Sequence, residues 1–253
     1  IAVSQSGETA DVLEAVKVAK SKNCKIISIV NVVGSSLSRT SDSFLNLNAG
    51  PEICVLATKS YTSQLALFML LSYALAGKYE EGKEKLNYLW NEIYHLTSIT
   101  SREKIKELAE KLVDNQHLFL IGRGLQYATA LEAALKIKEV SYIHAEAFAG
   151  GELKHGTIAL VEKGTPCIVF VSDENEKEIL SNAMEIKSRG GYIIGVSFKN
   201  NEIFDFWIKV PDVKMENPIV QIIPIQILAY QLSVLKGLDP DKPRNLAKSV
   251  TVK

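Results

Sequence analysis

Short runs of apolar, β-branched residues alternate along the chain with stretches that carry apolar residues at helical spacing. This alternation is typical of α/β folds, because two parallel strands need a crossover connection that is usually a helix. The first part of the chain is predicted to contain a strand end at residues 1–3, a helix at 9–20, a strand at 25–30 and a core helix at 65–76. Two charged amphipathic helices, at residues 80–97 and 101–115, are expected to connect two halves.

The second half repeats the pattern of the first. Strands are predicted at residues 117–121, 166–171, 192–197 and 206–210, and helices at 126–142 and 176–189. The strand–helix–strand unit at residues 1–30 matches the one at 167–197 with an offset of about 167 residues. Two copies of one α/β unit are therefore favoured over two unrelated α/β segments.

Composition excludes several classes of function. The 253 residues carry 29 basic and 29 acidic side chains without a basic run, so neither nucleic acid nor an anionic membrane is expected as a partner. Three scattered cysteines fit a reducing compartment, and we expect a cytoplasmic protein. The apolar stretch at 219–236 contains Gln and Pro, which favours a buried core helix over a membrane span. The chain opens on Ile-Ala-Val-Ser and is interpreted as a piece of a longer protein.

The sequence Ser-Gln-Ser-Gly-Glu-Thr at residues 4–9 lies between a predicted strand and a predicted helix. Hydroxyls and free backbone N–H groups at a helix N-terminus favour an anion such as phosphate. The alternative is that Ser6 or Thr9 only caps the helix. Because the pattern of a nucleotide P-loop is absent, the anion would belong to a small phosphorylated metabolite.

Two groups of ionisable residues are candidates for catalysis. Lys136 and Glu139 share one face of a helix that is otherwise apolar, so they form either a buried proton-transfer pair or an ordinary surface pair. Lys248 lies on a tail whose apolar residues Leu246, Val250 and Val252 are expected to dock it. A buried amine there could form a Schiff base; the alternative is a frayed tail.

The remaining candidates have weaker sequence support. His155, in Glu-Leu-Lys-His-Gly, suits proton transfer because histidine titrates near neutrality. Gly-Arg-Gly at residues 122–124 is the counterpart of a ligand loop or only a tight turn, and Ser60 is interpreted as a helix cap. Since no histidines have metal-ligand spacing, no metal is predicted.

Taken together, the motifs resemble the isomerase half of the glucosamine-6-phosphate synthase family, the glutamine:fructose-6-phosphate amidotransferases. They are Ser-Gln-Ser-Gly-Glu-Thr, Ala-Gly-Pro-Glu-Ile, Ala-Thr-Lys, Gly-Arg-Gly, Leu-Lys-Ile-Lys-Glu-Val-Ser-Tyr-Ile-His-Ala-Glu, Gly-Glu-Leu-Lys-His-Gly and Pro-Arg-Asn-Leu-Ala-Lys-Ser-Val-Thr-Val. The resemblance covers essentially the whole chain, and the closing tail is its most specific element.

The resemblance implies two doubly wound parallel-sheet sugar isomerase (SIS) subdomains, Rossmann/flavodoxin-like, followed by a C-terminal tail. The first subdomain would span residues 1–78 and lack its opening strand and helix, with a connecting helix at 79–100. The second would span residues 101–236, and the active-site tail residues 237–253.

The family's site residues can be carried over by position. Phosphate would be bound by Ser4, Gln5, Ser6 and Thr9, and the sugar would be contacted by Val55 and Ala247. Glu139 would move the proton between C1 and C2 with Lys136 close by, His155 would open the ring in the adjacent subunit, and Lys248 would form the Schiff base. Thr157 replaces a proline of many relatives and Leu56-Ala57 an Ala-Ser, both outside this catalytic set.

The implied reaction converts fructose 6-phosphate and ammonia to glucosamine 6-phosphate without a cofactor or metal. Implied partners are the sugar phosphate, a glutaminase domain of the same full-length chain, and a second copy in a homodimer. That glutaminase is missing here, so the chain alone should not hydrolyse glutamine. One alternative is an isomerizing glucosamine-6-phosphate deaminase, which the Asn-Leu-Ala-Lys tail disfavours. A non-catalytic sugar-phosphate-binding module is the other, and it would need none of Glu139, His155 and Lys248.

Overall fold

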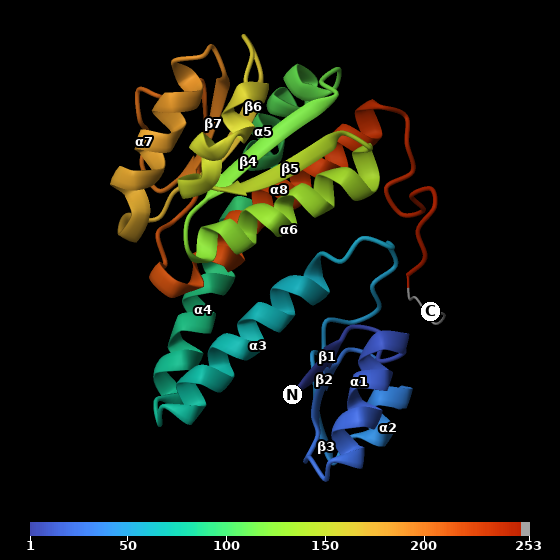
Figure 1. The fold of residues 1–253 in the computed structure, drawn as a ribbon. Coiled ribbons are helices and arrows are strands. Elements are labelled where there is room, and N and C mark those ends of the chain that lie inside the picture. Colours follow the sequence, from blue (N-terminus) through green and yellow to red (C-terminus); the bar gives the residue numbers. More distant parts are fainter. Residues whose placement is uncertain (249–253) are drawn as a thin grey trace. The chain divides into compact units, whose positions relative to one another are not determined.

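The computed structural model describes residues 1–248 (Figure 1). Its contacts divide the chain into two compact units. Unit 1 comprises Ile1–Tyr79 together with the described tail from Asp241, and unit 2 comprises Glu80–Pro240. The subdomain boundaries expected from the resemblance stay predictions, because these units are defined by contacts alone.

Unit 1 is built on a parallel three-stranded sheet. Its order is β1 (Ala2–Ser4), β2 (Ile27–Val30) and β3 (Ser43–Asn46), with α1 (Ala10–Ser21) and α2 (Ser36–Thr40) as the crossovers and α3 (Lys59–Leu75) after the sheet. The apolar side chains of α1 recur every three or four residues, so one face of the helix is apolar. That face packs on the sheet, and Val16, Val30 and Leu37 form the buried centre.

Unit 2 contains a parallel five-stranded sheet in the order β5-β4-β6-β7-β8. The strands are β4 (His117–Gly122), β5 (His144–Ala149), β6 (Pro166–Phe170), β7 (Tyr192–Ser197) and β8 (Phe206–Lys209). The helices are α4 (Tyr79–Leu96), α5 (Ile99–Leu112), α6 (Leu125–Ser141), α7 (Glu176–Lys187) and α8 (Asn217–Leu235), with short 3₁₀ helices η1 (Gly150–His155) and η2 (Thr157–Leu160) after β5.

Both faces of the unit 2 sheet are covered. Successive side chains of a strand point to opposite faces. In β6, Cys167 and Val169 pack with α7, while their neighbours Ile168 and Phe170 are also fully buried. The second face is covered by α6, which contacts β4, β5 and β6 and packs against α8 (Figure 1). Coverage of both faces explains why these strands are continuous apolar runs.

Helix α8 is long and apolar enough to cross a membrane by length and composition. However, 67% of its most apolar window is buried inside the protein. Its residues Ile222, Ile225 and Leu228 are fully buried. The sequence prediction of a buried core helix is therefore confirmed.

The parallel α/β architecture and its repeat are confirmed, since β1-α1-β2-β3 and β6-α7-β7-β8 have the same order and direction. The sequence did not predict α2, β3 or β5, because these elements are short and low in β-branched residues. The helix predicted at residues 65–76 is confirmed as part of α3, but the prediction that it lies in the core is wrong. Although α3 is rich in apolar residues, Ser60 is its only buried residue.

Candidate active site

The loop between β1 and α1 is organised by its own hydroxyl groups. Ser4 Oγ lies 2.9 Å from Thr9 Oγ1 and accepts a hydrogen bond from the Gly7 N–H at 3.0 Å. Ser6 Oγ accepts from the Glu8 N–H at 3.2 Å. Thr9, the N-cap residue of α1, makes no side-chain capping bond. The hydroxyls therefore line the start of α1 without capping it, and the helix dipole there favours an anion.

The same loop is held rigidly by its neighbours. The Asn31 N–H donates to the Gln5 carbonyl, and the Glu8 carboxylate accepts from the Ser36 N–H at 2.7 Å. That backbone hydrogen bond lowers the pKa of Glu8. Gly7 adopts φ +68°, and a Cβ there would lie 2.1 Å from Ser35 Oγ. Only glycine fits this loop without displacing its neighbour.

In unit 2, α6 brings Lys136 and Glu139 together as the sequence predicts. Lys136 Nζ lies 2.8 Å from Glu139 Oε2 and 3.3 Å from an oxygen of Glu132. The Lys136 side chain is only 3% exposed, and the two carboxylates are largely covered. Of the two alternatives that the sequence left open, the structure shows the buried pair.

The two carboxylates of this cluster differ in their surroundings. Burial, partly offset by Lys136, raises the pKa of Glu132. Glu139 Oε2 meets the Lys136 charge but receives no aligned hydrogen bond from any described residue. Glu139 is thus a largely buried carboxylate positioned by a single charge contact, and a carboxylate so placed can act as a general base toward a bound substrate.

His155 lies at the end of η1, away from this cluster. Its side chain is 70% exposed, and Nδ1 is 2.8 Å from Glu152 Oε2. An ionised carboxylate only accepts hydrogen bonds, so Nδ1 is the donor in this contact. Beneath η1, Arg123 Nε donates to Asn182 Oδ1 at 3.1 Å. A Cβ on Gly150 would lie 2.6 Å from that same oxygen, so the pair packs closely under the His155 segment.

Lys248 is held within unit 1. Its Nζ donates to the Cys54 carbonyl at 2.7 Å and lies 3.5 Å from Glu52 Oε2. The Glu52 side chain is 2% exposed and accepts hydrogen bonds from the Thr58 N–H and the Ser60 hydroxyl. Burial is the largest influence on the pKa of Glu52 and would raise it, but these hydrogen bonds and Lys248 outweigh burial and lower the pKa.

The tail contacts unit 1 at other points besides Lys248. The Val55 N–H donates to the Asp241 carbonyl at 3.3 Å, and Pro243 is buried. Leu246 is 45% exposed and Ala247 is exposed, so the expectation that Leu246 docks the tail is wrong. Lys248 is anchored instead by polar contacts. Val250 and Val252, also predicted to dock, lie outside the described residues.

The counterpart loop of unit 2 is filled by its own side chains. Asn175 Nδ2 donates to the Arg123 carbonyl and to Gln126 Oε1, and Ser172 donates to the same glutamine oxygen. The Arg123 carbonyl and the Gln126 side chain are thus paired within unit 2, while the N-cap residue of α6, Gly124, makes no side-chain capping bond. The two interpretations of this turn, a ligand loop and a tight turn, both stay predictions.

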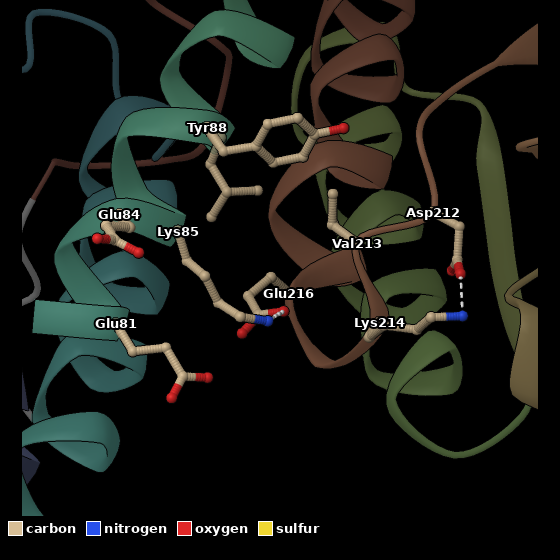
Figure 2. Close-up of a pocket in the computed structure, with 9 residues that line it drawn as sticks. Glu81, Glu84, Lys85, Tyr88, Asp212, Val213, Lys214 and Glu216 are labelled. Carbon is tan, nitrogen blue, oxygen red and sulfur yellow. Dashed lines mark hydrogen bonds and ion pairs between the residues drawn. The ribbon is translucent and has the colours of Figure 1, made fainter. Parts of the chain in front are cut away.

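A separate pocket of about 460 Å³ lies between α4 and the segment before α8 (Figure 2). Two ion pairs line this pocket: Lys85 Nζ lies 3.4 Å from Glu216 Oε2, and Lys214 Nζ lies 2.8 Å from Asp212 Oδ2. The Tyr88 side chain also lines it. None of the sequence-predicted site residues lines it.

The sequence reasoning missed Glu52 and Glu132. Glu132 precedes Lys136 by four residues and therefore lies on the same helix face, so helical spacing could have found it. Glu52 belongs to the Gly-Pro-Glu sequence before α3, where nothing local predicts contact with a lysine almost two hundred residues away.

The chain matches a known protein family. The model of the SIS domain matches residues 1–74 and 111–236. The glutamine–fructose-6-phosphate aminotransferase [isomerizing] of Pyrococcus horikoshii is 47% identical over 258 residues, which cover 100% of this chain and 43% of that protein. The chain thus spans less than half the length of this curated relative.

The chain is also similar to solved structures. The C-terminal domain of glucosamine-fructose-6-phosphate aminotransferase from Francisella tularensis is 38% identical with a TM-score of 0.82, over 95% of this chain and 72% of that one. A glucosamine-6-phosphate deaminase from Thermotoga maritima is 28% identical with a TM-score of 0.80, over 98% and 74% of the two chains.

Proposed function

Because the chain belongs to the SIS-domain family, we propose that it is the sugar-phosphate-converting part of a glutamine–fructose-6-phosphate aminotransferase. The reaction would convert fructose 6-phosphate and ammonia to glucosamine 6-phosphate. The observation that carries the proposal is the half-buried Lys248 amine, held against Glu52 and the Cys54 carbonyl in the unit that also bears the β1–α1 loop. A module that only binds a sugar phosphate needs no amine fixed in this way.

Binding and imine formation are assigned to unit 1. The sugar phosphate is bound by Ser4, Ser6 and Thr9 at the start of α1, with the Gln5 position in the same loop. Lys248 attacks the open-chain ketone at C2 and forms an imine, which ammonia then replaces. Val55 and Ala247 are proposed sugar contacts.

Proton transfer is assigned to unit 2. Glu139 moves the proton between C1 and C2, because its Oε2 is buried and receives no hydrogen bond from a described residue. The Lys136 charge 2.8 Å away would stabilise the negative charge that develops on the substrate. His155, oriented by Glu152, would open the sugar ring through Nε2.

The proposed partners follow from the same assignment. Ammonia would come from a glutaminase domain of the full-length chain, and His155 would serve the site of a second copy in a homodimer. Its exposed position on η1 supports a role toward a partner, since 70% of the side chain is accessible.

Replacement of the lysine tests the proposed function. Lys248→Arg keeps the charge but cannot form an imine, so fructose 6-phosphate conversion by the full-length protein should fall at least about a thousandfold. Binding of the sugar phosphate, measured by calorimetry, should change little because the β1–α1 loop is intact. Lys242→Arg, on the same tail and exposed, is the matched control. Full turnover by the Lys248→Arg protein would remove this lysine from the mechanism.

A further inference from the structure

Glu52 is the only carboxylate paired with Lys248 among the described residues, and the proposed mechanism gives it no role. We propose that Glu52 is the counter-ion of Lys248, balancing the positive charge on Nζ first as an ammonium and then as the protonated imine. This inference rests on the proposed function. It concerns a positioning residue, because Glu52 would act through the lysine and not on the sugar itself.

The charge on Nζ persists through the proposed step. A ketone and a lysine ammonium give a protonated imine and water: the carbonyl oxygen leaves with two of the three ammonium protons, and one proton stays on nitrogen. The C=O bond is replaced by C=N, and the total charge is +1 on both sides. One fixed negative charge therefore suits the site before and after the imine forms, without rearrangement.

Glu52 has the properties that a fixed counter-ion needs. Its side chain is 2% exposed, so water screens its charge weakly. One oxygen accepts the Thr58 N–H at 2.7 Å and the other accepts the Ser60 hydroxyl. These bonds hold the carboxylate in place and favour its ionised form. A carboxylate stabilised as an anion is a poor proton acceptor, so Glu52 balances charge and does not serve as a base.

The Cys54 carbonyl and the Glu52 carboxylate, the two groups that face Nζ, would have different roles. The Cys54 carbonyl lies at 2.7 Å from Nζ, the distance of a direct hydrogen bond, and would accept a hydrogen bond from the N–H that remains on the imine nitrogen. Glu52 Oε2, at 3.5 Å, supplies the charge. The other titratable groups that act in this cluster are the Cys54 thiol, whose pKa burial raises, and the Asp241 carboxylate.

A purely structural role for Glu52 is the competing explanation, because its hydrogen bonds also fix the start of α3. The two roles differ in one observable. Loss of a structural bond lowers stability at every pH, whereas loss of a counter-ion changes the pH above which the imine loses its proton. Cyanoborohydride reduces the protonated imine, so it reports this pH directly.

The experiment measures cyanoborohydride trapping of fructose 6-phosphate on Lys248 in the full-length protein, by mass spectrometry, from pH 6 to pH 9. The yield of adduct should fall at high pH, where the imine loses its proton. For Glu52→Gln this alkaline limb of the trapping profile should move to lower pH by about one unit, so that the yield at a given pH on the limb falls about tenfold. Glu52→Asp keeps the charge and should restore most of the profile. Glu80→Gln, which removes an exposed carboxylate paired with Lys83, should leave it unchanged.

The outcomes separate the two proposals. If the parent protein gives no adduct on Lys248, the proposed function fails, and the inference fails with it. If the parent is trapped and Glu52→Gln has the same alkaline limb, the counter-ion role is overturned while the proposed function stands. If Glu52→Gln does not fold, Glu52→Asp decides the question: its carboxylate lies farther from Nζ, so the alkaline limb should move to lower pH by about 0.3 unit, less than the full unit expected for Glu52→Gln, and a limb identical to the parent's overturns the role.

Discussion

At the scale of single residues, Lys136 is a buried charge whose burial must be compensated. An ammonium that is 3% exposed needs compensation for the water it has lost, and two carboxylates within 3.3 Å provide it. The compensation is reciprocal, because Glu132 and Glu139 would otherwise face each other as like charges. The cluster is therefore stable only as a set of three, which suits a site that must hold a base and a positive charge together.

Lys136→Met should destabilise unit 2 in a pH-dependent way. Without the ammonium the free energy of unfolding should fall by about 3 kcal/mol at pH 7, because two buried carboxylates lose their partner. Burial already raises the pKa of Glu132 in the folded protein. The protonated Glu132 carboxyl therefore stabilises the folded state at pH values below the pKa of Glu132 in the unfolded chain. This stabilisation is lost as the pH rises through the pKa of Glu132 in the folded protein. The destabilisation should therefore be smaller at pH 5, as measured by urea unfolding.

The matched control for this change is Lys106→Met. Lys106 pairs with Glu110 at 3.9 Å, and both side chains are 55% exposed. Its loss should cost less than about 1 kcal/mol at either pH. Equal destabilisation of Lys136→Met at pH 5 and pH 7 would contradict the argument that the buried charges set the stability.

At the scale of elements, the β1–α1 loop shows how short-range chemistry positions a site. Ser4 ends β1, Thr9 precedes α1, and their hydroxyls meet at 2.9 Å because the chain turns tightly at Gly7. This turn brings the hydroxyl groups to the positive end of the helix. A parallel sheet places such loops at the carboxyl ends of its strands, where α/β proteins bind ligands.

Gly7→Ala should weaken binding of the sugar phosphate. The added Cβ would lie 2.1 Å from Ser35 Oγ in a backbone conformation at φ +68°, so the loop must move. We expect the affinity for fructose 6-phosphate, measured by calorimetry on the full-length protein, to fall at least about tenfold. Gly34→Ala provides the control, since Gly34 has φ +80° with no atom within 4 Å of its added Cβ. Unchanged affinity in Gly7→Ala would argue against this loop as the phosphate site.

The elements also show where prediction from sequence succeeds. Long periodic segments such as α1, α6 and α7 were predicted within a residue or two, because their apolar spacing matches their buried faces. Strand β5 was not predicted, since its alanines form a strand only by pairing with β4. The contact of Lys248 with Glu52 is equally invisible in sequence, because it depends on how the tail returns to unit 1. The local sequence pattern thus predicts the long helices, whereas strand β5 and the contact of Lys248 with Glu52 depend on tertiary contacts that the pattern does not contain.

At the scale of the whole molecule, the two units contain the same strand–helix–strand topology, but the polar groups after the first strand differ. In unit 1 the hydroxyls after β1 lie at the start of α1, while in unit 2 the matching β6–α7 turn is closed by Asn175, whose Oδ1 accepts a hydrogen bond from the Ser172 N–H. The two copies therefore carry different side chains after the matching strand, and the buried Lys136 cluster belongs to unit 2. Both copies match the model of the SIS domain, at residues 1–74 and 111–236.

The central claim is that the full-length protein makes an amino sugar from fructose 6-phosphate. The direct test is to supply ¹³C-labelled fructose 6-phosphate with ammonia, and separately with glutamine, and to identify the product by NMR. The account predicts glucosamine 6-phosphate with nitrogen at C2 from both donors. A protein that forms no amino sugar, or that only converts glucosamine 6-phosphate to fructose 6-phosphate and ammonia, would contradict it.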